Sequence, residues 1–232
     1  MFEYKNIKIT KYSQSGFRID WQGQNLSNIP SKQVIYIDPF KVPNNEPTAD
    51  IIFISHQHYD HLDIDSLKKI TTSSTIILGN KLVKDALVNE DYIENFEILT
   101  PGFQKGINES LIYMAISAYN TNKFNDEKRL FHPKEQEGLG FILEFNMNTK
   151  NEIRIYFMGD TDFVKEEMTP VNIDILMIPI SGKYVMTKEE AVNAIESIEP
   201  KIAIPMHYDS GTGSLEDAKF LKDNTKTKIE II

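Results

Sequence analysis

Alternating hydrophobic and polar positions predict short β-strands through the first two thirds of the chain. Residues 17–21 alternate, and the apolar run at residues 34–37 ends at Asp38 and Pro39, a pair typical of turns. The apolar run at residues 51–55 is what a strand buried on both faces requires. Further strands are predicted at residues 76–78, 97–99, 111–116, 140–145 and 153–158.

Helical patterns alternate with strands later in the chain. One helix is expected to begin at Asp63, and residues 173–180 read as a buried strand. Residues 187–190 have the sequence of a capping box, which predicts a helix that Pro200 ends. A strand at residues 202–204 and a final helix capped by Ser214 follow. No repeat or linker interrupts these elements, so we expect one α/β (α+β) domain over residues 1–232, with mixed sheets covered by helices.

Composition narrows the chemistry that this domain can perform. The chain has no cysteine, which excludes disulfides, thiolate metal sites and a cysteine nucleophile. It has five histidines, so any imidazole site draws on those five. The formal net charge of −9 argues against general nucleic-acid binding. No basic start followed by an apolar run opens the sequence, and the apolar runs are far shorter than the roughly 20 residues of a membrane span. We therefore expect a cytoplasmic protein without a membrane partner.

Three of the five histidines lie in one short segment directly after the buried strand at residues 51–55. His56 and His58 are two residues apart, so an extended backbone points both imidazoles to the same side. Asp60 and His61 follow at once. Three imidazoles and a carboxylate form a ligand set suited to Zn²⁺, Mn²⁺ or Fe²⁺. A polar surface turn is the alternative, but the concentration of a scarce residue favours a metal site.

Residues 55–61 resemble the His-x-His-x-Asp-His signature of the metallo-β-lactamase superfamily of metal-dependent hydrolases. Residues 153–161, which end in Gly-Asp-Thr, resemble a second element of that superfamily, and residues 202–208 resemble the late strand that delivers its last histidine. Asp38-Pro39 and residues 178–182 are similar to small members that include sugar-phosphate lactonases. The resemblance implies a four-layer αββα sandwich of two mixed β-sheets with helices on the outer faces.

The resemblance also implies a binuclear metal site and a hydrolytic reaction. His56 and His58 would hold one ion, and Asp60, His61 and His207 would hold the second. Asp160 would bridge the two ions, and Asp60 and Asp160 are the expected catalytic carboxylates. Two Zn²⁺ ions are expected, with Mn²⁺ or Fe²⁺ as alternatives. Such a pair activates a hydroxide for attack on an ester, lactone or phosphodiester bond of a small, anionic substrate.

The chain departs from the superfamily pattern at one ligand position. Relatives carry another histidine after a strand that corresponds to residues 111–118, where this chain has Asn120. His132 is the candidate to complete the first metal site, and an exposed loop histidine is the alternative. Lys183 and Tyr184, together with Asn120, are candidate substrate contacts. Asp38 either organises the turn before Pro39 or accepts a hydrogen bond from a metal-bound histidine.

Two other functions are compatible with the same fold. Di-iron redox relatives carry a glutamate in place of His58 and usually an added flavin domain, and this chain has neither feature. A metal-binding protein without catalysis is the second alternative. The sequence makes no prediction of the oligomeric state.

Overall fold

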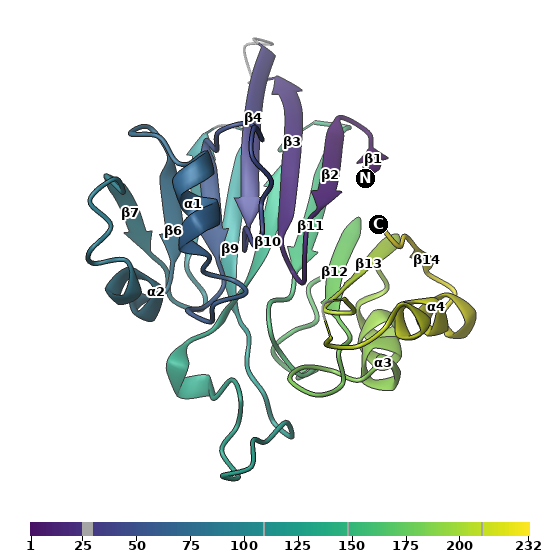
Figure 1. Ribbon diagram of the computed structural model, residues 1–232. Helices are drawn as coiled ribbons and strands as arrows, with labels where there is room; N and C mark the ends of the chain where they lie inside the picture. Colours follow the sequence, from purple (N-terminus) through teal and green to yellow (C-terminus); the bar gives the residue numbers. More distant parts are fainter. Residues whose placement is uncertain (25–29, 109, 148, 210) are drawn as a thin grey trace. The chain divides into compact units, whose positions relative to one another are not determined.

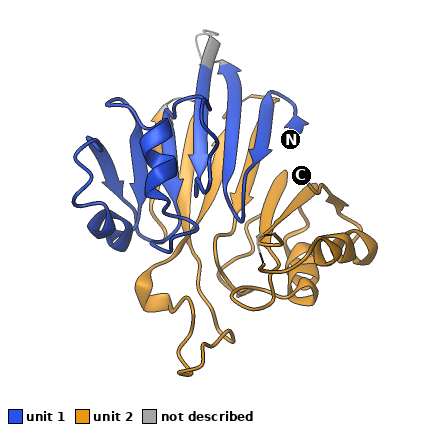
Figure 2. Ribbon diagram, in the orientation of Figure 1, with its two compact units in different colours: residues 1–100, 232 blue, residues 101–231 orange. Residues whose placement is uncertain are grey.

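Two β-sheets of seven strands each form the framework of this computed structural model (Figure 1). It describes residues 1–24, 30–108, 110–147, 149–209 and 211–232. The chain divides into two compact units (Figure 2). Unit 1 comprises Met1–Thr100 with Ile232, and unit 2 comprises Pro101–Ile231. Each unit contains one of the sheets, and the single domain predicted from the sequence stays a prediction.

Unit 1 begins with an antiparallel meander and continues with parallel strands. Its strands are β1 (Phe2–Tyr4), β2 (Ile7–Lys11), β3 (Phe17–Gln24), β4 (Pro30–Ile37), β5 (Ile51–Ile54), β6 (Ile76–Gly79) and β7 (Asn95–Ile98). They lie in sequence order, antiparallel from β1 to β4 and parallel from β4 to β7. The helices α1 (Ile64–Ile70) and α2 (Lys81–Ala86) connect the parallel strands.

Unit 2 repeats this plan. Its strands are β8 (Gln104–Asn108), β9 (Leu111–Ser117), β10 (Leu139–Phe145), β11 (Ile153–Phe157), β12 (Ile175–Pro179), β13 (Ile202–Met206) and β14 (Lys228–Ile229). Strands β8 to β11 are antiparallel, and β11 to β14 are parallel. The 3₁₀ helix η1 (Lys134–Gln136) precedes β10, and α3 (Lys188–Ile198) and α4 (Leu215–Asn224) connect the parallel strands. In both units the parallel strands end at the kind of sheet edge where open α/β sheets bind ligands.

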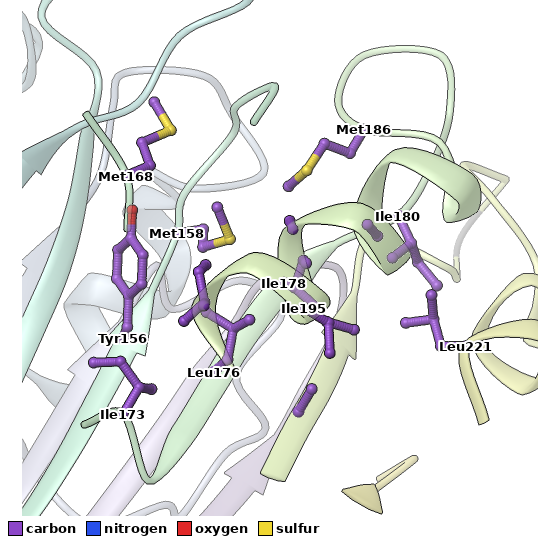
Figure 3. Packing of buried hydrophobic residues seen from close by; sticks show 14 of the residues in the cluster. Tyr156, Met158, Met168, Ile173, Leu176, Ile178, Ile180, Met186, Ile195 and Leu221 are labelled. Carbon is purple, nitrogen blue, oxygen red and sulfur yellow. The ribbon is translucent and has the colours of Figure 1, made fainter. Parts of the chain in front are cut away.

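Each sheet has one face on which its helices pack. In unit 1, Ile52 and Ile77 contribute to a buried core with Leu67 and Ile70 of α1. In unit 2, Leu176 of β12 lies in a core that includes residues of both α3 and α4 (Figure 3). Alternation along each strand places every second side chain on this face, as the period of a strand dictates.

The predicted helix starts are confirmed by their caps. The carboxylate of Asp63 accepts a hydrogen bond from the backbone N–H of Asp65 at 3.1 Å, and α1 begins at the next residue after Asp63. Thr187 and Glu190 form both hydrogen bonds of the capping box at the start of α3. Ser214 caps α4. These caps depend on residues within three positions of each other, which is why the sequence alone reveals them.

Several short elements escaped prediction from the sequence. Helix α2 has six residues and buries only Val83, so it lacks the repeated apolar stripe that marks a helix in sequence. The strands β8 and β14 lie at edges of their sheet. Strand β12 begins at Ile175 rather than at residue 173, although Ile173 still lies in the core. In the described part of the chain, no helix has the length and apolar character that crossing a membrane demands.

Candidate metal centre

The histidine segment of unit 1 forms a tight turn after β5. The backbone N–H groups of His61 and Leu62 both donate to the carbonyl of His58, at 3.0 and 2.8 Å. This turn brings the rings of His56 and His61 to a centroid distance of 4.0 Å and places Nε2 of His56 2.9 Å from Nδ1 of His58. His56 and His61 are buried, whereas His58 and Asp60 are half-buried. The three imidazoles predicted to act together therefore lie together.

Asp38 fixes the orientation of this turn from the end of β4. Its carboxylate is fully buried and accepts hydrogen bonds from the backbone N–H of Ser55 at 2.7 Å and from the Ser55 hydroxyl at 2.6 Å. The same carboxylate lies 2.6 Å from Nδ1 of His61. At this distance a hydrogen bond joins the two groups, and a carboxylate oxygen accepts it from a protonated Nδ1. Asp38 thus contacts both the backbone that begins the turn and a histidine of the cluster, and the two sequence-based interpretations of Asp38 stay predictions.

A second cluster, in unit 2, surrounds Asp160. Strand β11 is followed by Gly159, which has a φ of +71° and where a Cβ atom would lie 2.4 Å from the carbonyl oxygen of Leu139. Only glycine fits this turn, and the turn places the buried Asp160 immediately beyond the strand. His207 follows β13, and its Nε2 lies 2.8 Å from Oδ1 of Asp160. On the other side, Nε2 of His132 lies 3.3 Å from Oδ2 of Asp160.

His132 is therefore a buried neighbour of Asp160 and not an exposed loop residue. Its exposed fraction is 6%, and its ring and backbone both contact Asn120. Asn120 is itself 1% exposed, so its amide faces neighbouring residues of unit 2. The role of Asn120 as a substrate contact stays a prediction, but the structure gives it a contact with His132 that the sequence did not indicate.

One pair of donor atoms in unit 2 has the spacing of two ligands on a divalent cation. Metal–nitrogen and metal–oxygen distances near 2.0–2.2 Å on a tetrahedral zinc ion separate two ligand atoms by about 3.4 Å. The 3.3 Å between His132 and Asp160 agrees with that spacing. The 2.8 Å between Nε2 of His207 and Oδ1 of Asp160 is shorter than that spacing. The two oxygens of one buried carboxylate thus face separate imidazoles.

A buried ionic network holds the segment that follows β9, and the sequence did not reveal it. The ammonium group of Lys123 lies 3.2 Å from Asp162 and 2.8 Å from Glu190, and its side chain is 8% exposed. Asp162 also accepts hydrogen bonds from the backbone N–H groups of Thr121 and Asn122. Burial would raise the pKa of Glu190, but hydrogen bonds from Lys123, from the backbone of the helix cap and from the Asn122 amide lower that pKa. The network links the start of α3 to the residues next to Asn120.

The two remaining candidate substrate residues lie beside this segment. Lys183 is exposed, and its ammonium group lies 4.9 Å from the ring centroid of Tyr184. Tyr184 packs edge-to-face against Phe131, the neighbour of His132, at a centroid distance of 4.8 Å. Their proximity to His132 in unit 2 is compatible with substrate contact, which stays a prediction.

Histidine and carboxylate clusters at strand ends, on two mixed sheets of this topology, define the metallo-β-lactamase class of proteins. A family model described as "Beta-lactamase superfamily domain" matches residues 8–207, and the chain belongs to this superfamily.

Comparison with known proteins narrows the class further. The chain is 31% identical over 217 residues to a UPF0173 metal-dependent hydrolase of Cupriavidus metallidurans, which covers 81% of this chain and 72% of the relative. It is 27% identical over 204 residues to a UPF0173 metal-dependent hydrolase of Thermoplasma acidophilum, over 83% of this chain and 84% of the relative. A crystal structure from Parabacteroides distasonis, proposed to be a metal-dependent hydrolase, has a TM-score of 0.76 and 28% identity, and the match covers 97% and 92% of the two chains.

These similarities confirm the predicted superfamily and fold class and place the chain among metal-dependent hydrolases. The similarity to sugar-phosphate lactonases stays a prediction.

Proposed function

We propose that this protein is a hydrolase that uses two divalent ions, most simply Zn²⁺, to cleave an ester, lactone or phosphodiester bond of a small anionic molecule. The observation that carries the proposal is the position of Asp160, whose two carboxylate oxygens each face the Nε2 atom of a different buried histidine. A carboxylate in that position offsets the charge of two cations and fixes their separation.

The proposed ligands are those that the sequence resemblance implies. His56 and His58, with His132, would hold the first ion, and Asp60, His61 and His207 the second, with Asp160 shared. Imidazole and carboxylate donors without thiolates suit Zn²⁺, and Mn²⁺ or Fe²⁺ remain within the range of this donor set.

The side chains of this protein have defined tasks in such a reaction. When bound, the ions lower the pKa of a water ligand and polarise the bond to be cleaved. Asp38 would accept a hydrogen bond from Nδ1 of His61 and leave Nε2 of this ring available to hold an ion. Asp60 and Asp160 would supply negative charge to the metal site. A protein nucleophile is unnecessary in this scheme.

The anionic character of the substrate is proposed from Lys183. This lysine is exposed and forms no ion pair with another residue in the part of the chain that the structure describes. Its ammonium group lies over Tyr184, whose ring packs on Phe131 next to His132. A carboxylate or phosphate group on the substrate would find in Lys183 a positive charge close to a proposed metal ligand.

Metal analysis followed by a hydrolysis screen tests the proposal. Purified protein is expected to contain close to two zinc ions per chain and to hydrolyse a member of a panel of lactones, phosphodiesters and thioesters. Asp160→Asn should lose metal and at least about 100-fold of the activity, whereas Asp217→Asn on α4 should retain both.

Three outcomes would contradict the proposal. Full activity of Asp160→Asn would refute the two-ion mechanism. Bound zinc without turnover on any bond class would favour a metal-binding protein, and iron with a visible charge-transfer band would favour redox chemistry.

A further inference from the structure

The sequence resemblance implies a metal-binding histidine at the position of Asn120, and the amide of Asn120 contacts the ring of His132. We infer that Asn120 is the positioning residue that sets the tautomer and orientation of His132, so that this histidine replaces the missing ligand. The inference rests on the proposed function, because it assigns His132 to the first metal ion.

The orientation of the Asn120 amide follows from its hydrogen bonds. Its Nδ2 donates to the backbone carbonyl of Tyr184 at 3.1 Å, and a carbonyl oxygen accepts only. The oxygen Oδ1 of Asn120 must therefore face the other way, where it accepts from the backbone N–H of His132 at 2.9 Å. The same oxygen lies 3.0 Å from Nδ1 of the His132 ring. Only this orientation of the amide satisfies the backbone N–H of His132, its ring Nδ1 and the backbone carbonyl of Tyr184 together.

This arrangement determines the proton position on His132. Because Oδ1 of Asn120 is an acceptor, Nδ1 of His132 carries the ring proton, and in a neutral imidazole Nε2 then carries the lone pair. Nε2 is the atom that faces Oδ2 of Asp160 at 3.3 Å. A histidine that donates its other N–H to a carbonyl is the usual metal-bound form.

Backbone hydrogen bonds on both sides of the Asn120–His132 contact stabilise it. The backbone N–H of Asn120 donates to the carbonyl of His132 at 2.7 Å, and that of Phe131 donates to Lys123 at 3.1 Å. The residues between them therefore form a hairpin whose base is the Asn120–His132 pair. The neighbouring Lys123 is fixed in turn by Asp162 and Glu190. These contacts hold His132 against Asn120 across a sequence separation of 12 residues.

A double-mutant cycle in the full-length protein tests the inference. Asn120→Leu removes the acceptor at similar volume and is expected to weaken binding of one Zn²⁺ ion by about 10- to 100-fold, measured by competition with a chromophoric chelator. Asn120→Asp keeps an acceptor for the Nδ1 proton and should retain most of the affinity. In a His132→Ala background, Asn120→Leu should cause no further loss. Asp126→Leu, at an exposed position of the same hairpin, is the matched control.

Two results of the cycle would overturn the inference. One is wild-type zinc affinity for Asn120→Leu, and the other is an equal loss in the presence and absence of His132. A purely structural role for Asn120 would lower the melting temperature in both backgrounds without coupling the two residues in zinc affinity.

A measurement on the wild-type protein covers the case in which Asn120→Leu fails to fold. The ¹⁵N shifts of the His132 ring, recorded before and after zinc addition, should show the Nδ1–H tautomer in both states. A protonated Nε2 in the zinc-loaded protein would refute the inference. If the protein binds no zinc, the proposed function fails, while the tautomer of His132 in the metal-free protein still decides whether Asn120 sets it.

Discussion

Lys123 offers the sharpest test of how burial controls the energy of an ion pair in this protein. Its ammonium group contacts Asp162 and Glu190, and the exposed fractions of the lysine and Asp162 side chains are 8% and 3%. Lys123→Met keeps the aliphatic stem and removes the charge. Both carboxylates then lose their counter-ion, and the buried Asp162 has no water to replace it.

The loss in free energy of unfolding depends on the hydrogen bonds and the solvent exposure that Asp162 and Glu190 retain. Removing one partner of a buried ion pair costs about 3–5 kcal/mol. Asp162 retains hydrogen bonds from Thr121 and Asn122, and the Glu190 side chain is 32% exposed, so water can screen it. We therefore expect the lower end, about 3 kcal/mol, in the free energy of unfolding. For a chain of this size that corresponds to a fall of about 6–12 °C in melting temperature.

Thermal unfolding followed by circular dichroism measures this loss against a matched control. Lys219 pairs with Glu216 on α4 at the same 2.8 Å, but its side chain is 52% exposed. Lys219→Met should therefore cost at most about 1 kcal/mol. Equal shifts for the two variants would refute the reasoning, because they would show that burial does not strengthen the Lys123 network.

Three further predictions concern pH, a buried hydroxyl and a turn. Hydrogen bonds lower the pKa of Glu190 in the folded state, so they stabilise the protein at pH values above the unfolded-state pKa of about 4.3. The difference in the free energy of unfolding between wild type and Lys123→Met should therefore shrink as the pH falls below about 4. The hydroxyl of Tyr156 is buried without a hydrogen-bond partner among the described residues, so Tyr156→Phe should stabilise the protein by about 1 kcal/mol, measured by urea unfolding. Tyr36→Phe loses the hydrogen bond to the carbonyl of Pro47 and should destabilise the protein. Gly159→Ala should lower the free energy of unfolding by more than about 2 kcal/mol and lower the metal content. Gly102 also has a positive φ but lies in open space, so Gly102→Ala should lower the free energy of unfolding only by the backbone strain of about 1 kcal/mol. Equal losses for the two glycine variants would contradict the proposed clash.

The sequence by itself determined the features that depend on neighbouring residues. The buried run before His56 and the turn through His61 lie within a few residues of each other, so the sequence predicts that three imidazoles act together. The caps at Asp63, Thr187 and Ser214 are local for the same reason. Short elements without a repeated apolar pattern, such as α2, left no comparable signal.

Tertiary structure alone decided which distant residues meet. Asp38 reaches His61 because β4 and β5 are parallel neighbours, and that pairing joins residues 23 positions apart. The contact of His132 with Asp160 and Asn120, and of Lys123 with Glu190, depends on how β9, β11 and α3 pack in unit 2. Hydrophobic periodicity records which face of a strand is buried, but it contains no information on which loop closes over the end of that strand. The five histidines indicated the chemistry, and the packing of unit 2 decided that one of them, His132, lies beside Asp160.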